Sequence, residues 1–164
     1  MRFGFGFDIH PIVENRKLIL GGTEIPFNKG LLGHSDADVL SHAICDALLG
    51  AATLGNIGTQ FPNTDAQYNN ISSLLLLERT AKLIRANHFE ISNIDATIVL
   101  QEPKINTFIS FMRANIAQSL SLELQRISVK ATTSEHLGFI GRNEGIAAFA
   151  VASLFDNNFQ HSER

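Results

Sequence analysis

Two kinds of side chain alternate strictly at the start of the chain. Over residues 2–10 the odd positions are large and apolar, whereas the even positions carry two glycines followed by Asp8 and His10. A period of two is typical of a β-strand, whose successive side chains point to opposite faces. The pattern predicts a strand with one apolar face and one glycine face, which a ligand or another backbone can approach closely. The apolar face consists of Phe3, Phe5, Phe7 and Ile9.

The rest of the chain interleaves helical and extended patterns. Residues 17–27 contain two glycines and a proline, which predict a bend or a hairpin. Apolar residues at helical spacing predict helices, apolar runs predict strands, and segments rich in Gly, Asn, Pro or Asp predict loops. The alanines of the final apolar run, residues 146–155, would also suit a helix. The predicted helices are 36–54, 72–87 and 105–121, the strands 92–101, 126–132 and 146–155, and the loops 55–71 and 133–145.

This order of elements predicts an α/β protein, more closely an α+β sandwich. We expect a mixed sheet of about four main strands with helices on one face, plus a small hairpin. A chain of 164 residues is typical of a single domain. We expect that domain to span residues 1–156, with a polar C-terminal tail at 157–164.

Composition and charge narrow the functional classes. The net charge is −3 and basic residues form no cluster, which argues against a nucleic-acid partner. We also expect no membrane association and no signal peptide, because the longest apolar runs fall short of a bilayer span. Cys45 is the single cysteine, so a disulfide framework is excluded. The cytoplasm is the expected location.

Asp8 and His10 leave the same face of the first predicted strand, and both are residue types that bind zinc. A third ligand is available in His42, inside the helix predicted at 36–54. Three protein ligands leave one tetrahedral position open, as in a catalytic zinc site. Asp46, one helical turn further on, is expected to orient the ring of His42. The alternative is that Asp8 and His10 merely end a strand and that His42 is a core histidine with its hydrogen bonds satisfied.

Two further polar segments suit phosphate chemistry. Residues 33–38 precede the first predicted helix, where free N–H groups and a hydroxyl bind anions; the alternative is a simple helix cap at Ser35 or Asp36. Residues 130–135 combine three hydroxyls with a carboxylate, which suits phosphate oxygens and Mg²⁺, or else a polar turn after a strand. Arg142 follows a glycine-rich stretch and could bind a diphosphate.

Taken together and in order, these motifs resemble one known family. The chain looks like the cyclodiphosphate synthases of the non-mevalonate isoprenoid pathway, from about residue 1 to residue 155. The motifs that carry the resemblance are Gly6-Phe7-Asp8-Ile9-His10, Lys29-Gly30-Leu31-Leu32, His34-Ser35-Asp36, the run from Asp46 to Ala52, Pro103-Lys104, Lys130-Ala131-Thr132-Thr133, Glu135, and Gly138-Phe139 with Gly141-Arg142.

The resemblance implies an activity with named roles. Asp8, His10 and His42 would bind Zn²⁺, Glu135 would help to hold Mg²⁺ or Mn²⁺, and His34 and Thr133 would steady the transition state. The implied substrate is 4-diphosphocytidyl-2-C-methyl-D-erythritol 2-phosphate. Its 2-phosphate attacks the β-phosphate and CMP leaves, which yields 2-C-methyl-D-erythritol 2,4-cyclodiphosphate.

The resemblance also implies which residues contact the substrate. Cytosine would lie against the segment around Pro103, and the long loop would hold the erythritol. Two asparagines stand where the family usually has aspartate, which reduces negative charge near an anionic substrate. The implied contacts are Asp8, Ile9, His10, His34, Ser35, Asn56, Ile57, Gly58, Phe61, Pro62, Asn63, Thr64, Asp65, Leu100, Gln101, Glu102, Pro103, Lys104, Ile105, Asn106, Thr132, Thr133, Ser134, Glu135, Phe139 and Arg142; the two asparagines are Asn56 and Asn63.

By the same resemblance we expect a homotrimer, with the active site between subunits and the sheets facing the threefold axis. A central cavity on that axis would take an isoprenoid diphosphate. Phe5 and Phe149 would make it more apolar than in relatives, and Arg142 with Glu144 would supply its polar ring.

Two other functions compete with the cyclase. The first is a non-catalytic trimeric module in which zinc staples the fold and the apolar axis carries a prenyl diphosphate; it leaves Thr132, Thr133 and Glu135 without a purpose. The second is a zinc hydrolase, which needs a general base near the metal-bound water. The sequence offers no carboxylate with a clear claim to that role.

Overall fold

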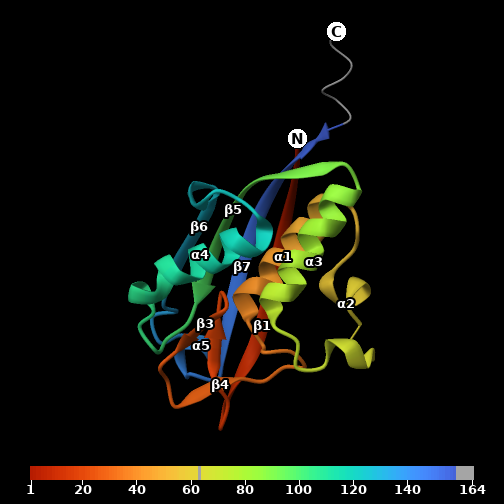
Figure 1. Ribbon diagram of the computed structural model, residues 1–164. Coiled ribbons are helices and arrows are strands. Elements are labelled where there is room, and N and C mark those ends of the chain that lie inside the picture. Colours follow the sequence, from red (N-terminus) through yellow and green to blue (C-terminus); the bar gives the residue numbers. More distant parts are fainter. Residues whose placement is uncertain (63, 158–164) are drawn as a thin grey trace.

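The computed structural model describes residues 1–62 and 64–157. Five strands form one mixed sheet in the order β4-β1-β7-β5-β6, and β1, β5 and β6 run in the same direction. Helices α1, α3 and α4 lie together over one face of this sheet (Figure 1). The strands are β1 (Arg2–Glu14), β4 (Lys29–Leu31), β5 (Phe89–Val99), β6 (Ile127–Thr132) and β7 (Gly145–Asp156), and the helices are α1 (Val39–Ala51), α3 (Ser73–Ala86) and α4 (Ile109–Leu120).

Shorter elements complete the chain. Strands β2 (Leu18–Leu20) and β3 (Thr23–Ile25) form a separate hairpin, as predicted. The segment predicted as a loop at 55–71 contains α2 (Ile57–Gln60) and the 3-10 turn η1 (Ala66–Tyr68). The other short helical elements are η2 (Asn106–Phe108), η3 (Leu124–Arg126) and α5 (Gly138–Gly141).

The predicted fold class is confirmed: four long strands and the short β4 form a mixed sheet with helices on one face. The final apolar run is strand β7, between β1 and β5. Its even positions from Ile146 to Leu154 are buried, whereas Phe149, Val151 and Phe155 are exposed on the other face. A strand with one covered and one uncovered face explains this alternation.

Helix α1 lies unusually close to β1, and two glycines allow it. A Cβ atom added to Gly6 would lie 1.9 Å from the carbonyl oxygen of Ala43, and one added to Gly4 would lie 2.0 Å from that of Ala47. The glycine face of the strand is therefore the site where a helix backbone approaches. The opposite face of β1 is uncovered: Phe3 and Phe5 are 68% and 64% exposed.

The first helix begins at Val39, later than predicted, because Asp38 caps it. Asp38 is fully buried and accepts hydrogen bonds from the backbone N–H and the hydroxyl of Ser41. It also accepts the N–H groups of Gly21 and Gly22, so it ties the β2–β3 hairpin to the helix. The expectation that Ser35 or Asp36 caps this helix is wrong, since a capping side chain must lie within reach of the N2 or N3 amide.

Two sequence predictions lie outside the described residues: Asn63, and the tail from residue 158 to residue 164. Within the described ranges, every helix is too short or too polar to cross a lipid bilayer.

Candidate metal and phosphate site

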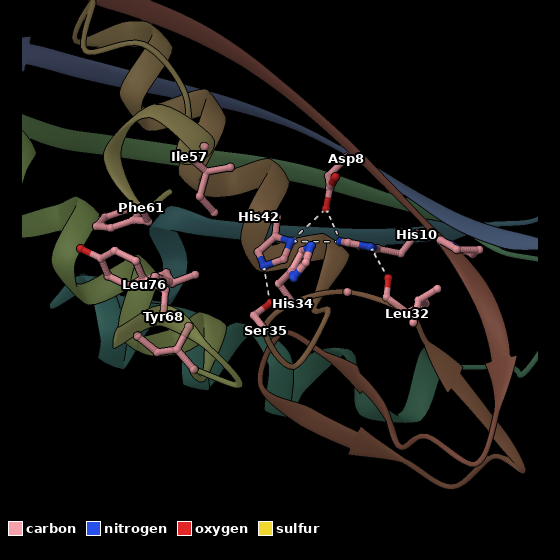
Figure 2. A pocket seen from close by; sticks show the side chains of 14 residues that line it. Asp8, His10, Leu32, His34, Ser35, His42, Ile57, Phe61, Tyr68 and Leu76 are labelled. Carbon is pink, nitrogen blue, oxygen red and sulfur yellow. Dashed lines mark hydrogen bonds and ion pairs between the residues drawn. The ribbon is translucent and has the colours of Figure 1, made fainter. Parts of the chain in front are cut away.

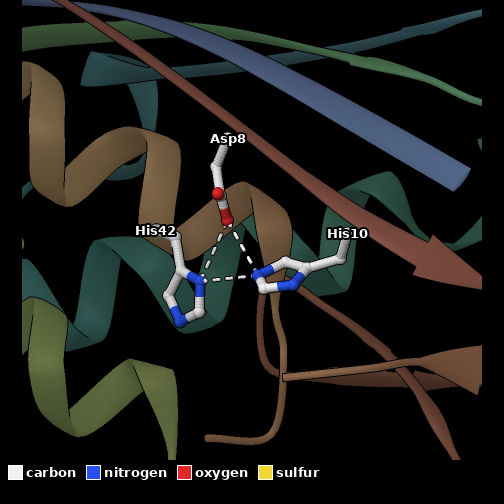
Figure 3. Close-up of side chains that lie close together, drawn as sticks. All are labelled: Asp8, His10 and His42. Carbon is white, nitrogen blue, oxygen red and sulfur yellow. Dashed lines mark hydrogen bonds and ion pairs between the residues drawn. The ribbon is translucent and has the colours of Figure 1, made fainter. Parts of the chain in front are cut away.

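Asp8, His10 and His42 meet at the point where β1 passes under α1. Oδ2 of Asp8 lies 3.0 Å from Nε2 of His10 and 3.0 Å from Nδ1 of His42, and the two ring nitrogens are 3.2 Å apart. Figure 3 shows the three side chains converging on one point from a strand and a helix. The sequence prediction that these three residues share a cation therefore has the required geometry.

The size of this triangle matches a small divalent ion. Tetrahedral zinc with nitrogen and oxygen ligands at about 2.05 Å requires ligand atoms about 3.3 Å apart. The observed separations of 3.0 to 3.2 Å need only a slight expansion. One carboxylate and two imidazoles form a ligand set that zinc accepts, and the side chains leave a fourth position open to the pocket.

Hydrogen bonds to the histidines explain the charge state of the carboxylate. Burial of Asp8 opposes its ionisation, but hydrogen bonds and charge attraction from His10 and His42 outweigh burial and lower its pKa to about 2. Burial likewise opposes protonation of His10, and Asp8 outweighs it and raises the pKa of His10. A cation bound to Asp8 and His10 would replace the proton on Nε2 of His10, so a metal ion and a proton compete for the same site.

The second nitrogen of each imidazole also has a partner. Nδ1 of His10 lies 2.7 Å from the carbonyl oxygen of Leu32 and donates to it, which leaves Nε2 for a metal. Nε2 of His42 lies 2.9 Å from Oγ of Ser73 and 3.1 Å from Oγ of Ser35. The prediction that Asp46 orients His42 is wrong.

Asp46 instead accepts the backbone N–H of Ile57 at 2.7 Å and so holds the start of α2. Burial is the main cause that raises its pKa. Ser73 was missed because its sequence neighbours indicate only a helix start. The feature that draws attention to Ser73 is its complete burial, 0% exposed for a polar residue, and burial is known only from the folded structure.

A cavity of about 680 Å³ opens beside the three ligands (Figure 2). His34 and Ser35 line it next to His42, and α2 contributes Ile57 and Gly58. Among the described residues, Asn56, Pro62, Thr64 and Asp65 lie outside its wall; Asn56 instead caps α2 through the N–H of Thr59. Lining residues absent from the predicted substrate contacts are Pro11, Leu32, Gly33, Tyr68, Ile71 and Leu76; of these, only Gly33 belongs to a segment predicted to bind phosphate.

The predicted second metal segment forms a turn after β6. The hydroxyl of Thr133 donates to a carboxylate oxygen of Glu135 at 2.6 Å. The segment predicted to bind cytosine lies beside it: the N–H of Leu100 donates to the carbonyl of Thr132, and the side-chain oxygen of Gln101 accepts the N–H of His136. The segments 100–106 and 132–135 are therefore neighbours, joined by the parallel pairing of β5 and β6.

Within one chain, this turn and the Asp8 cluster lie far apart. Thr132 pairs with Val99, Val99 with Ala147, and Ala147 with Ile9. Three strand spacings separate β6 from β1, about 14 Å in total. Asp8 lies on the helix-covered face, whereas Thr132 is on the uncovered face, because alternate residues point in opposite directions.

Phe139 lies in α5 and Arg142 lies just after it, near the start of β7. Phe139 is 39% exposed. The guanidinium of Arg142 makes two hydrogen bonds to the carboxylate of Glu144, at 2.8 and 2.9 Å. A diphosphate that bound Arg142 would therefore have to displace Glu144 or bind alongside it.

The fold and the site together define an α/β protein in which a candidate three-ligand metal site opens into a pocket with polar and apolar walls. The YgbB family model matches residues 1–155. The chain belongs to this family, that of the 2-C-methyl-D-erythritol 2,4-cyclodiphosphate synthases.

Its relatives include a curated protein named 2-C-methyl-D-erythritol 2,4-cyclodiphosphate synthase from Syntrophobacter fumaroxidans. It is 56% identical over 94% of this chain and 97% of its own length. A solved structure of the bifunctional IspDF from Campylobacter jejuni is 46% identical, with a TM-score of 0.91 over 96% of this chain; the present chain spans 43% of that protein. A CDP complex of IspF from Plasmodium falciparum is 37% identical, with a TM-score of 0.83, and the match covers 96% and 97% of the two chains.

Proposed function

We propose that this protein converts 4-diphosphocytidyl-2-C-methyl-D-erythritol 2-phosphate to 2-C-methyl-D-erythritol 2,4-cyclodiphosphate and CMP. An oxygen of the 2-phosphate forms a bond to the β-phosphorus. The bond between that phosphorus and the oxygen bridging to the α-phosphate breaks, and CMP leaves with its electron pair. The observation that carries the proposal is the triangle of Asp8, His10 and His42 at the wall of the pocket, in a chain of this family.

The residues of the pocket suit this reaction. The nucleophile is a phosphate that is already ionised, so the difficulty lies in bringing two anions together in line. A divalent ion held by Asp8, His10 and His42 would supply Lewis-acid neutralisation of phosphate charge. His34 and Ser35 line the same cavity, where their ring and hydroxyl can donate to phosphate oxygens. The cavity orients both ends of one molecule for an internal attack.

We further propose that the active site forms between copies of the chain, in a homotrimer. Two metals that act on one phosphate group lie about 4 Å apart. The position proposed for Mg²⁺ or Mn²⁺, at Glu135, is in a turn after β6, about three strand spacings from Zn²⁺ at Asp8. A neighbouring copy can bring its own Thr133 and Glu135 to this cavity. The exposed row of phenylalanines on β1 and β7 supports burial of this face by other copies.

The same uncovered face also supports the proposal that a central cavity between copies binds an isoprenoid diphosphate. The rings of Phe7 and Phe149 lie 5.0 Å apart, and those of Phe5 and Phe149 lie 6.3 Å apart. Such a ligand would place its chain against these rings and its diphosphate near Arg142. The non-catalytic alternative, a zinc-stapled module, is less favoured because it gives the pocket and the hydroxyl turn no role.

Replacement of His42 by alanine is expected to abolish CMP release. Several kcal/mol of transition-state stabilisation depend on the cation, so we expect a loss of about 1000-fold or more. Purified protein, substrate and Mg²⁺ are sufficient for the measurement. The matched control is His88→Asn, at an exposed histidine with a positive φ that asparagine tolerates. Equal rates for H42A and the parent would overturn the metal assignment.

A shared active site makes a prediction for mixed oligomers. Coexpressed H42A and Glu135→Gln chains, each inactive alone, are expected to regain about a third of the parental rate in purified mixed trimers, because one site in three of either mixed composition combines both intact residues. The two chains carry different affinity tags so that mixed oligomers can be purified. A mixture as inactive as its components would place both residues in sites within one chain.

A further inference from the structure

Ser73 is a buried hydroxyl at the first turn of α3, outside the pocket wall. It is 0% exposed, and it lies between a proposed metal ligand and a carboxylate. Its Oγ is 2.9 Å from Nε2 of His42 and donates its proton to a carboxylate oxygen of Asp36. Its backbone N–H donates to the other oxygen of Asp36 at 2.9 Å. Two hydrogen bonds to one carboxylate fix Ser73 in place.

The direction of these hydrogen bonds determines the state of the imidazole. A hydroxyl has one proton, and Ser73 gives it to Asp36, whose carboxylate accepts hydrogen bonds. Toward His42, Ser73 can therefore act only as an acceptor. Nε2 of His42 must therefore carry a ring proton. When His42 binds a cation, its lone pair is then on Nδ1, the nitrogen that otherwise donates to Asp8. That is the atom which lies 3.0 Å from Asp8 and 3.2 Å from His10.

Ser35 has a different role, although it lies 3.1 Å from the same nitrogen. Its Oγ accepts the N–H of Ala37 and faces the cavity, so its proton can point to a ligand. Figure 2 shows Ser35 at the pocket wall below His42. Ser73 does not line the cavity, and its contact with Nε2 is the shorter of the two.

We propose that Ser73 is a positioning residue that aims His42 at the metal. The chain Asp36–Ser73–His42 is a carboxylate–histidine–metal triad with a serine inserted between the first two members. It holds the ring proton on Nε2, fixes the plane of the ring and keeps Nδ1 directed at Asp8 and His10. This inference rests on the metal site proposed above.

The test is the affinity of the full-length protein for Zn²⁺, measured by competition with a chelator, together with the visible spectrum of bound Co²⁺. Ser73→Ala is expected to raise the Kd for Zn²⁺ about 10- to 100-fold, as for other residues that orient a metal ligand, and to alter the Co²⁺ spectrum. The matched control is Ser72→Ala, at the adjacent serine. Ser72 is exposed, and its side chain makes no capping hydrogen bond to α3 within the described part of the chain. S72A is expected to leave both measurements unchanged.

A second pair of variants separates the hydroxyl from side-chain bulk. Ser73→Thr and Ser73→Val have nearly the same shape, and only S73T is expected to recover Zn²⁺ affinity. The inference is overturned if S73A binds Zn²⁺ as tightly as the parent, if S72A weakens binding equally, or if S73T and S73V behave alike. A parent protein that binds neither ion would overturn the metal site as well, whereas tight parental binding with an unaffected S73A overturns this inference alone.

Discussion

Gly6→Ala is expected to destabilise the protein strongly and to abolish tight metal binding. The new Cβ would lie 1.9 Å from the carbonyl oxygen of Ala43 and 2.6 Å from the backbone N of Ala47. Both are backbone atoms of α1, so the whole helix has to move rather than one side chain. Overpacking of this kind costs about 1–3 kcal/mol when side chains yield, and we expect more than about 3 kcal/mol here.

The loss of metal affinity has the same cause. His42 precedes Ala43 on α1, and Asp8 follows Gly6 on the same face of β1. A helix displaced from the strand carries Nδ1 of His42 away from Oδ2 of Asp8, which it contacts at 3.0 Å. Thermal unfolding and Zn²⁺ titration measure the two effects.

The matched control for this variant is Gly50→Ala, in the same helix. A Cβ at Gly50 has open space: apart from its chain neighbours and the local helix backbone, the nearest atom is the carbonyl oxygen of Phe5, 4.0 Å away. Alanine in a helix interior is favoured over glycine by about 0.5–1 kcal/mol, so G50A should be neutral or stabilising. A G6A protein that melts at the parental temperature would show that the close approach of α1 and β1 is unnecessary.

Asp38→Ala is expected to cost about 3 kcal/mol or more, because it leaves several buried donors without an acceptor. Those donors are the N–H groups of Gly21, Gly22 and Ser41 and the hydroxyl of Ser41, at 2.7 to 3.1 Å. Burial raises the pKa of Asp38, so the charge itself opposes folding. The loss of the acceptor costs more than removal of the buried charge gains, since the donors of the buried network are then left unpaired.

Asp38→Asn distinguishes these contributions. It keeps the shape and one acceptor oxygen, and it removes the buried charge, but its NH₂ group faces donors; we expect a loss smaller than that of D38A. Asp65→Ala is the control: Asp65 is only partly buried, and its carboxylate accepts hydrogen bonds from the backbone and side chain of Gln67 in a short surface turn, so the unfolding midpoint should stay nearly unchanged. Urea unfolding at neutral pH measures all three, and a D38A midpoint equal to the parental one would contradict this account.

The local pattern predicted much of the fold. Alternation at 2–10 identified both faces of β1, and apolar spacing identified α1, α3 and α4, because these periods are properties of a single segment. It failed at the ends of elements. Helix α1 starts at Val39 rather than near residue 36, because Asp38 is held by Gly21 and Gly22, sixteen or seventeen residues before it.

Residue type and order by themselves determined which side chains can bind a cation, since Asp8, His10 and His42 are ligands by their chemistry. Only the tertiary structure decided which residues support them. Ser73 lies 31 residues from His42 in sequence and 37 from Asp36, and the packing of α3 against α1 brings them together. The register of strand pairing likewise decided that Thr132 and Asp8 lie on opposite faces. Such contacts join segments that are far apart in sequence. The hydrophobic pattern within one segment contains no information on which other segment packs against it.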